Sequence, residues 1–242
     1  MNFIEPDHIQ MLRDTLKKFI KNEMPKSLVS KWDQEDYFPK DVFKKLVDLG
    51  VTSLTVPEEY GGSGIDMVAT IATIEELSSR SIGIASGFIQ CACYAGLNIL
   101  ESGSIEQKNE LLPRVVNGEL LFSYGISEPD VGGDVASVST IARLENDEVI
   151  INGSKRWCSG ALIADYIFAL VRSGPADERY RNLSIVLIPP NIKGVTITPQ
   201  NTMGLKGTGG TCDVYFDDVR VPQANILGGL DGWNNGWSKI IS

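Results

Sequence analysis

The chain has 242 residues, of which 43% are apolar and 22% charged, and its formal net charge is -9 at pH 7. That length is sufficient for one large domain or two ordinary domains with real hydrophobic cores. The acidic balance disfavours a nucleic acid or an anionic membrane surface as a partner, because both carry negative charge themselves.

The first residues, "MNFIEPDHIQMLRD", lack the basic start and apolar core of a secretory signal. The four cysteines, Cys91, Cys93, Cys158 and Cys212, are therefore expected to be reduced thiols that pack in the interior of a cytoplasmic protein. Cys91 and Cys93 lie two apart on a predicted helix and do not face each other, so we expect no metal site. His8, the sole histidine, is expected to be exposed to solvent.

The first half of the chain shows helical periodicity. Apolar residues recur at helical spacing over 9–20 and again over 42–49, and Gly50 follows the second run as a helix-terminating glycine would. A third helix is predicted from about Asp66. The apolar stretch 81–100 contains polar interruptions, which favour a buried helix over a membrane span. We predict an all-helical domain over residues 1–118.

The second half reads as short strands at intervals of about 12 residues, separated by Gly, Pro and Asn-Asp clusters. Asn146-Asp147 predicts a hairpin between the runs 139–145 and 148–153, because short Asx residues tolerate the left-handed turn. We predict an α+β protein in which an antiparallel β-barrel or sandwich follows the helices. This β-domain should cover 119–230, and 231–242 should begin a further, truncated helical domain.

The stretch "SEPDVGGD" (127–134) predicts a turn, and one interpretation of this turn is that it binds a ligand. Pro129 stops the preceding strand, and Gly132-Gly133 allow a close backbone approach with N–H groups turned outward. Such a turn can hold an anion or the polar edge of a ring. Its three carboxylates, Glu128 among them, are expected to face solvent; an ordinary β-turn is the alternative interpretation.

Two further stretches are candidates. In "INGSKRWCSG", Trp157 lies two residues before the hydroxyl of Ser159, an arrangement suited to a planar heteroaromatic ligand; the alternative is a core tryptophan with a capping serine. "GLKGTGGT" (204–211) lacks the Gly-Lys-Ser/Thr ending of a phosphate loop and runs into a predicted strand. We interpret it as a hairpin loop, whose Lys206 could meet a ligand phosphate.

Four motifs in order, "VPEEYGGSGIDMV", "YGISEPDVGGD", "INGSKRWCSG" and "MGLKGTGGTCDVYFDDVRVP", resemble the acyl-CoA dehydrogenase family of flavoproteins. The resemblance covers nearly the whole chain. It implies an N-terminal helical domain, a middle β-domain and FAD as the cofactor, with the C-terminal helical bundle of the family absent from these residues.

Carried over by position, the resemblance assigns site residues to the run from Tyr124 to Gly133 and to "WCS". Backbone amides of Ile126 and Ser127, with the Ser127 hydroxyl, would bind the pyrimidine end of the flavin, and Gly132 would belong to the same turn. Trp157, with Cys158 beside it, would pack on the ring, and Ser159 would hydrogen-bond near flavin N5.

Two positions depart from the family pattern. Gly133 stands where the family often has Ser, close to the pyrophosphate and the acyl-CoA, which puts the substrate preference in doubt. Gly160 stands where the family often has Asn.

The family reaction needs a base to remove the proton α to a thioester carbonyl. The resemblance places that base, a glutamate, on the C-terminal domain beyond Ser242, so no catalytic residue is assigned in this chain. Glu75, Glu76 and Glu128 are expected to be solvated helix or turn residues.

The resemblance implies an acyl-CoA substrate, electron-transfer flavoprotein as the electron acceptor and a homo-oligomer, dimer or tetramer. Two alternatives remain open at this point: a related flavin oxidase or monooxygenase, and a non-catalytic fragment or half of a split enzyme that serves as an interaction module. Reoxidation kinetics of the reduced flavin would separate the first alternative from a dehydrogenase.

Overall fold

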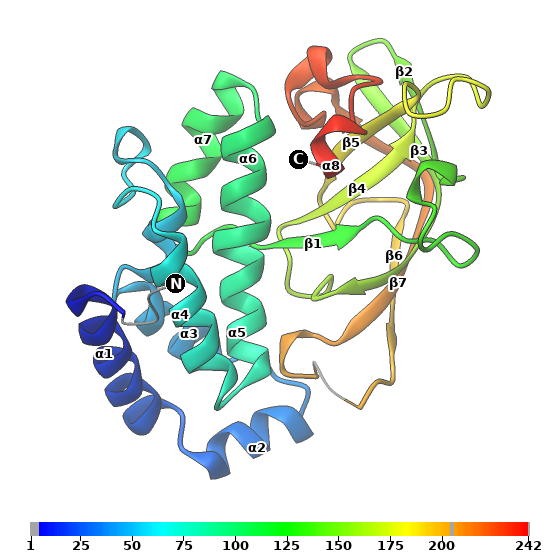
Figure 1. Cartoon of the computed structure of the whole chain (residues 1–242). Helices are drawn as coiled ribbons and strands as arrows, with labels where there is room; N and C mark the ends of the chain where they lie inside the picture. Colours follow the sequence, from blue (N-terminus) through cyan, green and yellow to red (C-terminus); the bar gives the residue numbers. More distant parts are fainter. Residues whose placement is uncertain (1–4, 204–205, 242) are drawn as a thin grey trace.

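A computed structural model describes residues 5–203 and 206–241 and shows a helical region beside a curled sheet (Figure 1). The helices of the first half are α1 (Asp7–Glu23), α2 (Lys26–Gln34), α3 (Lys40–Val47), α4 (Met67–Ser78), α5 (Ile82–Phe88), α6 (Asn98–Ser102) and α7 (Ile105–Val116). A π-helical stretch, Ile89–Leu97, joins α5 to α6 without a break. A short helix, α8 (Ser238–Ile241), lies at the C-terminal end.

Local sequence signals explain where these helices begin and end. Asp66 caps α4, because its carboxylate accepts a hydrogen bond from Ala69 N at 2.9 Å. Ser104 and Gln107 form a reciprocal capping box at the start of α7. Gly50 adopts φ +81° after α3, as expected of a helix-terminating glycine. The predicted helical start near Asp66 is therefore confirmed.

The second half forms a seven-stranded sheet within the described residues. Its strands are β1 (Phe122–Gly125), β2 (Ile141–Glu145), β3 (Glu148–Ser159), β4 (Tyr166–Arg172), β5 (Leu183–Ile188), β6 (Val195–Gln200) and β7 (Thr211–Pro222). The spatial order is β1-β4-β2-β3-β7-β6, and β5 pairs with β4. The β2–β3 hairpin forms at Asn146, whose φ is +56°, as predicted.

The sequence of helices followed by a β-domain is confirmed, but the sheet is mixed rather than wholly antiparallel. β1 pairs with β4 in parallel, and β2 meets β4 in parallel at Ile141 and Arg172. The reason is topological: the chain passes through the β2–β3 hairpin before β4 returns beside β1, so these neighbours in space are not neighbours in sequence.

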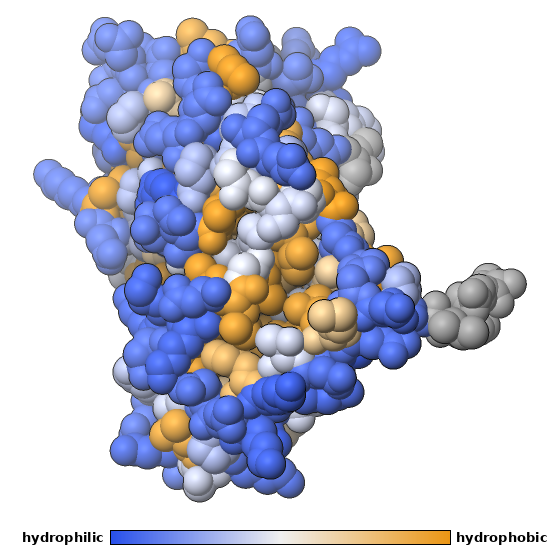
Figure 2. Space-filling model, turned by 90° about the vertical axis from the view of Figure 1, so that its left-hand side faces the viewer, coloured by the Kyte–Doolittle hydropathy of each residue, from blue (hydrophilic) through white to orange (hydrophobic). Residues whose placement is uncertain are grey.

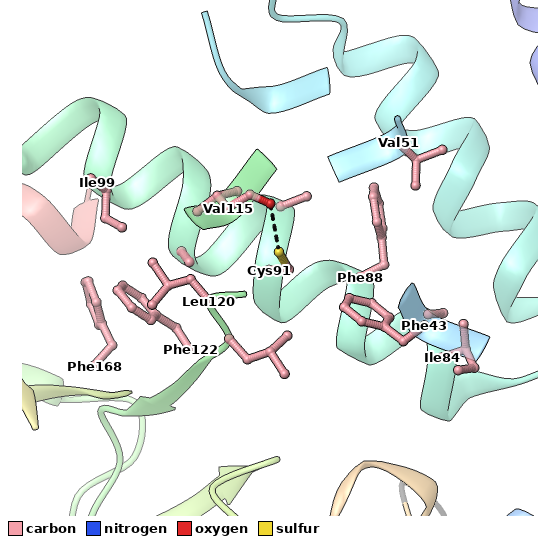
Figure 3. Close-up of a cluster of buried hydrophobic side chains, with 14 of the residues drawn as sticks. Phe43, Val51, Ile84, Phe88, Cys91, Ile99, Val115, Leu120, Phe122 and Phe168 are labelled. Carbon is pink, nitrogen blue, oxygen red and sulfur yellow. Dashed lines mark hydrogen bonds between the residues drawn. The ribbon is translucent and has the colours of Figure 1, made fainter. Parts of the chain in front are cut away.

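Both regions contribute to one large hydrophobic core (Figure 3). Helical side chains such as Phe88 and Ile99 pack in the same cluster as Phe122 of β1 and Phe168 of β4. A second cluster, which includes Val149 and Val214, is formed mainly by side chains of the sheet. One face of the sheet therefore packs on the helices.

The continuous helix Ile82–Ser102 is long and apolar enough to cross a membrane by length and composition, but more than half of its most apolar window is buried inside the protein. Its apolar composition is thus explained by its place in the core.

Apolar side chains also gather in a band on the face of the molecule shown in Figure 2. On α4, Met67, Val68 and Ile71 are exposed.

Candidate functional site

The turn predicted after β1 begins with a tyrosine held by the helices. Tyr124 stacks on Tyr94 with 4.0 Å between ring centroids, and its hydroxyl accepts a hydrogen bond from Asn98 Nδ2 at 2.6 Å. Burial raises the pKa of Tyr124 to about 12, so the phenol is neutral near pH 7. Tyr124 therefore anchors the start of the turn on the helical side, through partners that sequence reasoning did not identify.

The hydrogen bonds that close the turn lie before Gly132 and Gly133 in the sequence. Glu128 N donates to Val131 O at 2.8 Å and Val131 N donates to Glu128 O at 3.2 Å, which leaves Pro129 and Asp130 at the tip. Gly132 and Gly133 are exposed, and a Cβ added at either would meet no described atom within 4 Å. Neither has a left-handed φ. Packing among the described residues does not require glycine at these two positions, and the space in front of them is open.

Trp157 lies directly beside this turn, because Arg156 N donates to Ser127 O at 2.8 Å. The side chain of Trp157 is 56% exposed, so the alternative of a core tryptophan is wrong. Its φ of +62° coincides with a bulge in the β3–β7 pairing between Lys155 and Cys158. A bulky residue in the left-handed region is strained, and such strain concentrates at functional sites.

Ser127 is partly exposed and Trp157 is exposed, so solvent reaches both residues. Within the described part of the chain, the Ser127 hydroxyl makes no hydrogen bond. The Arg156 guanidinium lies 5.0 Å from the centroid of the Trp157 ring. We call Ile126, Ser127, Trp157 and Ser159 the Ser127–Trp157 platform; its two turns come from β1 and β3.

The residues after Trp157 alternate between the platform and the core. Ser159 Oγ lies 2.9 Å from Thr211 Oγ1, and its carbonyl accepts from Ser123 Oγ at 2.9 Å. Cys158 is different: its thiol is buried in the second cluster, opposite Cys212, and burial raises its pKa to about 12. Only the backbone of Cys158 is therefore available to a ligand.

Gly160 is required by its own conformation and by a neighbour. Its φ is +75°, and a Cβ there would lie 2.3 Å from Nε2 of Gln90. Gln90 comes from the π-helical stretch and is buried, and its Oε1 has no hydrogen-bond partner among the described residues. The amide of Gln90 thus fills the volume that a side chain at position 160 would occupy.

The expectation that Glu128 faces solvent is wrong. Its carboxylate is buried and lies 2.8 Å from Nζ of the buried Lys155. Burial raises the pKa of Glu128, but the Lys155 ammonium and hydrogen bonds from Ser139 lower it by more, to about 2. Burial lowers the pKa of Lys155. Strict alternation along β3 places Lys155 on the same face as Val149 and Ile151, a sequence signal that would have indicated its burial.

The other acidic candidates lie away from the platform. Arg13 of α1 binds Glu75 at 2.5 Å and Glu76 at 3.0 Å, both on α4. Glu75 is exposed as expected, whereas Glu76 is partly buried. The loop 204–211 is described only in part, because residues 204–205 and the side chain of Lys206 lie outside the described residues. The predicted contact of Lys206 with a phosphate therefore lies outside them as well. The described residues contain no cluster of His, Cys, Asp and Glu suited to a metal ion.

A cavity of about 330 Å³ adjoins the platform. Its lining includes Tyr94, Asn98, Tyr124, Ile126 and Lys239. It therefore extends from the first residue of the turn along the helical side to the C-terminal segment.

Comparison with known proteins agrees with this architecture. Residues 6–119 match the family model "Acyl-CoA dehydrogenase, N-terminal domain", and residues 123–219 match "Acyl-CoA dehydrogenase, middle domain". A probable acyl-CoA dehydrogenase of Bacillus subtilis, YngJ, is 33% identical over 229 residues, which are 94% of this chain and 60% of the relative.

Glutaryl-CoA dehydrogenase of Desulfococcus multivorans is 30% identical over 231 residues, 94% of this chain and 59% of that protein. The solved structure of a glutaryl-coenzyme A dehydrogenase glutaryl-CoA complex superposes with a TM-score of 0.89 at 30% identity, over 99% of this chain and 60% of that one. The chain thus spans about 60% of the length of these relatives. The helical region, the curled sheet and the matched motifs show together that the chain belongs to the acyl-CoA dehydrogenase family.

Proposed function

We propose that this chain forms the flavin-facing part of an FAD-dependent acyl-CoA dehydrogenase. The observation that carries the proposal is the hydrogen bond between Arg156 N and Ser127 O, which brings the two predicted turns together next to an exposed Trp157. An exposed indole beside an unpaired hydroxyl fits a planar ring with a polar edge. The proposed domains are 1–118, 119–230 and, at the end, the start of a further helical domain over 231–242.

In this proposal each platform residue has one task. The Ser127 hydroxyl and the backbone at Ile126 and Ser127 hold the polar edge of the flavin ring, and Trp157 covers one face and excludes water. Ser159, oriented by Thr211, hydrogen-bonds the ring near its centre. FAD, when bound, supplies the hydride-accepting chemistry, while the protein orients it and tunes its affinity.

The substrate proposal rests on the open space around the turn. An acyl-CoA thioester would pass Gly132 and Gly133, where the described structure leaves room, and its acyl group would enter the cavity beside Tyr124 and Ile126. Electron-transfer flavoprotein is the proposed acceptor of the electrons. The complete protein is proposed to be a cytoplasmic dimer or tetramer.

The base for α-proton abstraction is proposed to come from outside these 242 residues. Glu128 is committed to Lys155 and is buried, and Glu75 and Glu76 are bound by Arg13 on the far side of the helices. None of these carboxylates can reach a thioester on the platform without breaking its ion pair. The Glu128 carboxylate also accepts hydrogen bonds from Ser139 N and Thr140 N, and it would lose them if it moved to act as a base.

The first test is the DNA that follows codon 242. An in-frame helical continuation with a glutamate suited to act as the base supports the proposal, and the protein it encodes should reduce an artificial dye when given acyl-CoA thioesters. Residues 1–242 alone are expected to bind FAD weakly or not at all. A stoichiometric yellow flavin spectrum for this chain alone would contradict the proposed need for a further segment.

The platform itself is tested by Trp157→Ala in the complete protein, which should lose FAD more readily than it loses its fold. Tyr180→Ala is a matched control, because Tyr180 is also exposed, has φ +72° and lies 5.1 Å below the guanidinium of the preceding Arg179. FAD content per protein is measured by absorbance after gel filtration. Equal FAD content in the parent and in Trp157→Ala would refute the assigned role.

A further inference from the structure

Behind the platform lies an ion pair that the proposed chemistry does not use. Lys155 Nζ lies 2.8 Å from Glu128 Oε1, and the two side chains are 0% and 2% exposed. Of the ion pairs formed among the described residues, this one has the least exposed partners. Glu128 belongs to the turn after β1, whereas Lys155 belongs to β3, so the pair joins the two segments that carry the platform.

The carboxylate is fully bonded on both oxygens. Glu128 Oε2 accepts from Ser139 N at 2.7 Å and from Ser139 Oγ at 2.6 Å, and Oε1 accepts from Thr140 N at 2.9 Å. The Lys155 ammonium also donates to Ile126 O at 3.4 Å. The turn is thereby tied to the residues before β2 and to β3 at once.

Two successive residues of β3 hold three successive residues of the turn. Lys155 holds Ile126 and Glu128, and Arg156 N holds Ser127 O. The next residue along β3 is Trp157, where the strand bulges and the backbone turns left-handed. The ion pair is therefore placed at the last regular position before the strained residue of the platform.

Stability alone does not account for such a pair. The cost of removing two charges from water offsets much of their attraction, and apolar replacement of a buried pair is often neutral or stabilising. In some proteins a buried, multiply bonded pair fixes a single geometry instead. Here that geometry is the relative position of the turn and the bulge.

We propose that Glu128 and Lys155 are positioning residues, whose buried pair holds the Ile126–Ser127 backbone and the Trp157 bulge in the arrangement that receives a planar ring. The inference rests on the proposed function for the identity of the ring. The fixed geometry itself requires no ligand, so the two can be tested apart.

The test variant is Glu128→Gln combined with Lys155→Met. It leaves no unpaired buried charge, the glutamine oxygen can still accept from Thr140 N, and methionine keeps the volume of the lysine stem. The variant loses the ion pair and the hydrogen bonds from Ser139 to the second carboxylate oxygen, while the hydrogen bond from Arg156 N to Ser127 O remains. The control is Glu148→Gln combined with Arg220→Met, which removes an exposed 2.9 Å pair at the opposite end of β3.

Both double variants and the parent are labelled with fluorotryptophan, and the Trp157 signal among the four tryptophans is assigned with Trp157→Phe. Without ligand, fluorine NMR should show one narrow Trp157 signal in the parent and the control. The test variant should show a broadened or split Trp157 signal with the other three signals unchanged. FAD, titrated into the complete protein and followed by its fluorescence, should bind about tenfold more weakly to the test variant, as when contacts behind a binding residue are removed.

An unchanged Trp157 signal together with unchanged FAD affinity in the test variant overturns the inference. If FAD fails to bind the parent, the proposed function fails, and the ligand-free signal alone decides the inference. Should all four signals collapse in the test variant, Glu128→Asp takes its place, because the shorter carboxylate cannot keep its contacts with both Lys155 on one oxygen and Ser139 on the other. The same two results are then read from that variant.

Discussion

Acid should destabilise this fold through Glu128 more than through any exposed carboxylate. The carboxyl has an ordinary pKa of 4.5 and a pKa of about 2 in the fold. A carboxyl whose pKa falls on folding stabilises the protein when ionised, so its contribution is complete above about pH 4.5 and is lost as the pH falls toward 2. The difference corresponds to about 3 kcal/mol, because one pH unit is worth about 1.4 kcal/mol. That is a large part of the stability of an ordinary domain.

Urea unfolding at a series of pH values from 6 downward measures the effect. The parent should lose stability with falling pH by about 3 kcal/mol more than the variant with Glu128→Gln and Lys155→Met, in which this carboxyl is absent. Exposed acidic groups contribute equally to both proteins and cancel in the difference. The control with Glu148→Gln and Arg220→Met should follow the parent. Parallel curves for the parent and the Glu128 variant would refute the assignment of a strongly acidic, buried Glu128.

Three further outcomes are expected. Gly160→Asn should cost about 1–3 kcal/mol in urea unfolding through overpacking against Gln90, and adding Gln90→Ala should recover part of that loss; a loss that Gln90→Ala leaves unchanged would exclude the steric cause. Gly133→Ser should change the unfolding free energy by less than about 0.5 kcal/mol, because the added atoms meet open space; a larger loss would show that the turn needs glycine for its fold. Burial raises the pKa of Cys93 to about 11, and the other three cysteines are buried. The native chain should therefore react slowly with Ellman's reagent at pH 8 and expose its four thiols only after unfolding. Rapid labelling of the native chain would contradict this packing.

Periodicity predicted most of the helical region and failed where helices end. Leu16, Phe19, Val42 and Phe43 are buried as their spacing indicates. Leu49 was expected on the same stripe as Phe43 but is exposed, because α3 ends at Val47 and helical spacing no longer applies beyond it. The parallel pairing of β1 with β4 could not be predicted, since hairpin signals describe only strands that are neighbours in sequence.

The adjacency of the two candidate turns was expected from the sequence and its family resemblance, but the contacts that support those turns were not. Ser127 and Trp157 were expected in one place, and their turns are adjacent. The burial of Glu128 was missed, because a carboxylate between Ser and Pro looks solvated unless its partner, 27 residues later in the chain, is known. Tyr94 and Asn98 were missed for the same reason: their contact with Tyr124 is made by tertiary packing and leaves no local pattern.

Gln107 connects features that the sequence divides between two domains. Its backbone and side chain complete the cap of α7, and its amide also donates at 2.8 Å to the carbonyls of Ala224 and Ile226 beyond β7. Gln107 thus caps α7 and also binds the segment that follows β7. The two regions share a hydrophobic core as well. The boundary near residue 118 therefore separates two stretches of sequence but not two cooperative units, and helices and sheet should melt in a single transition.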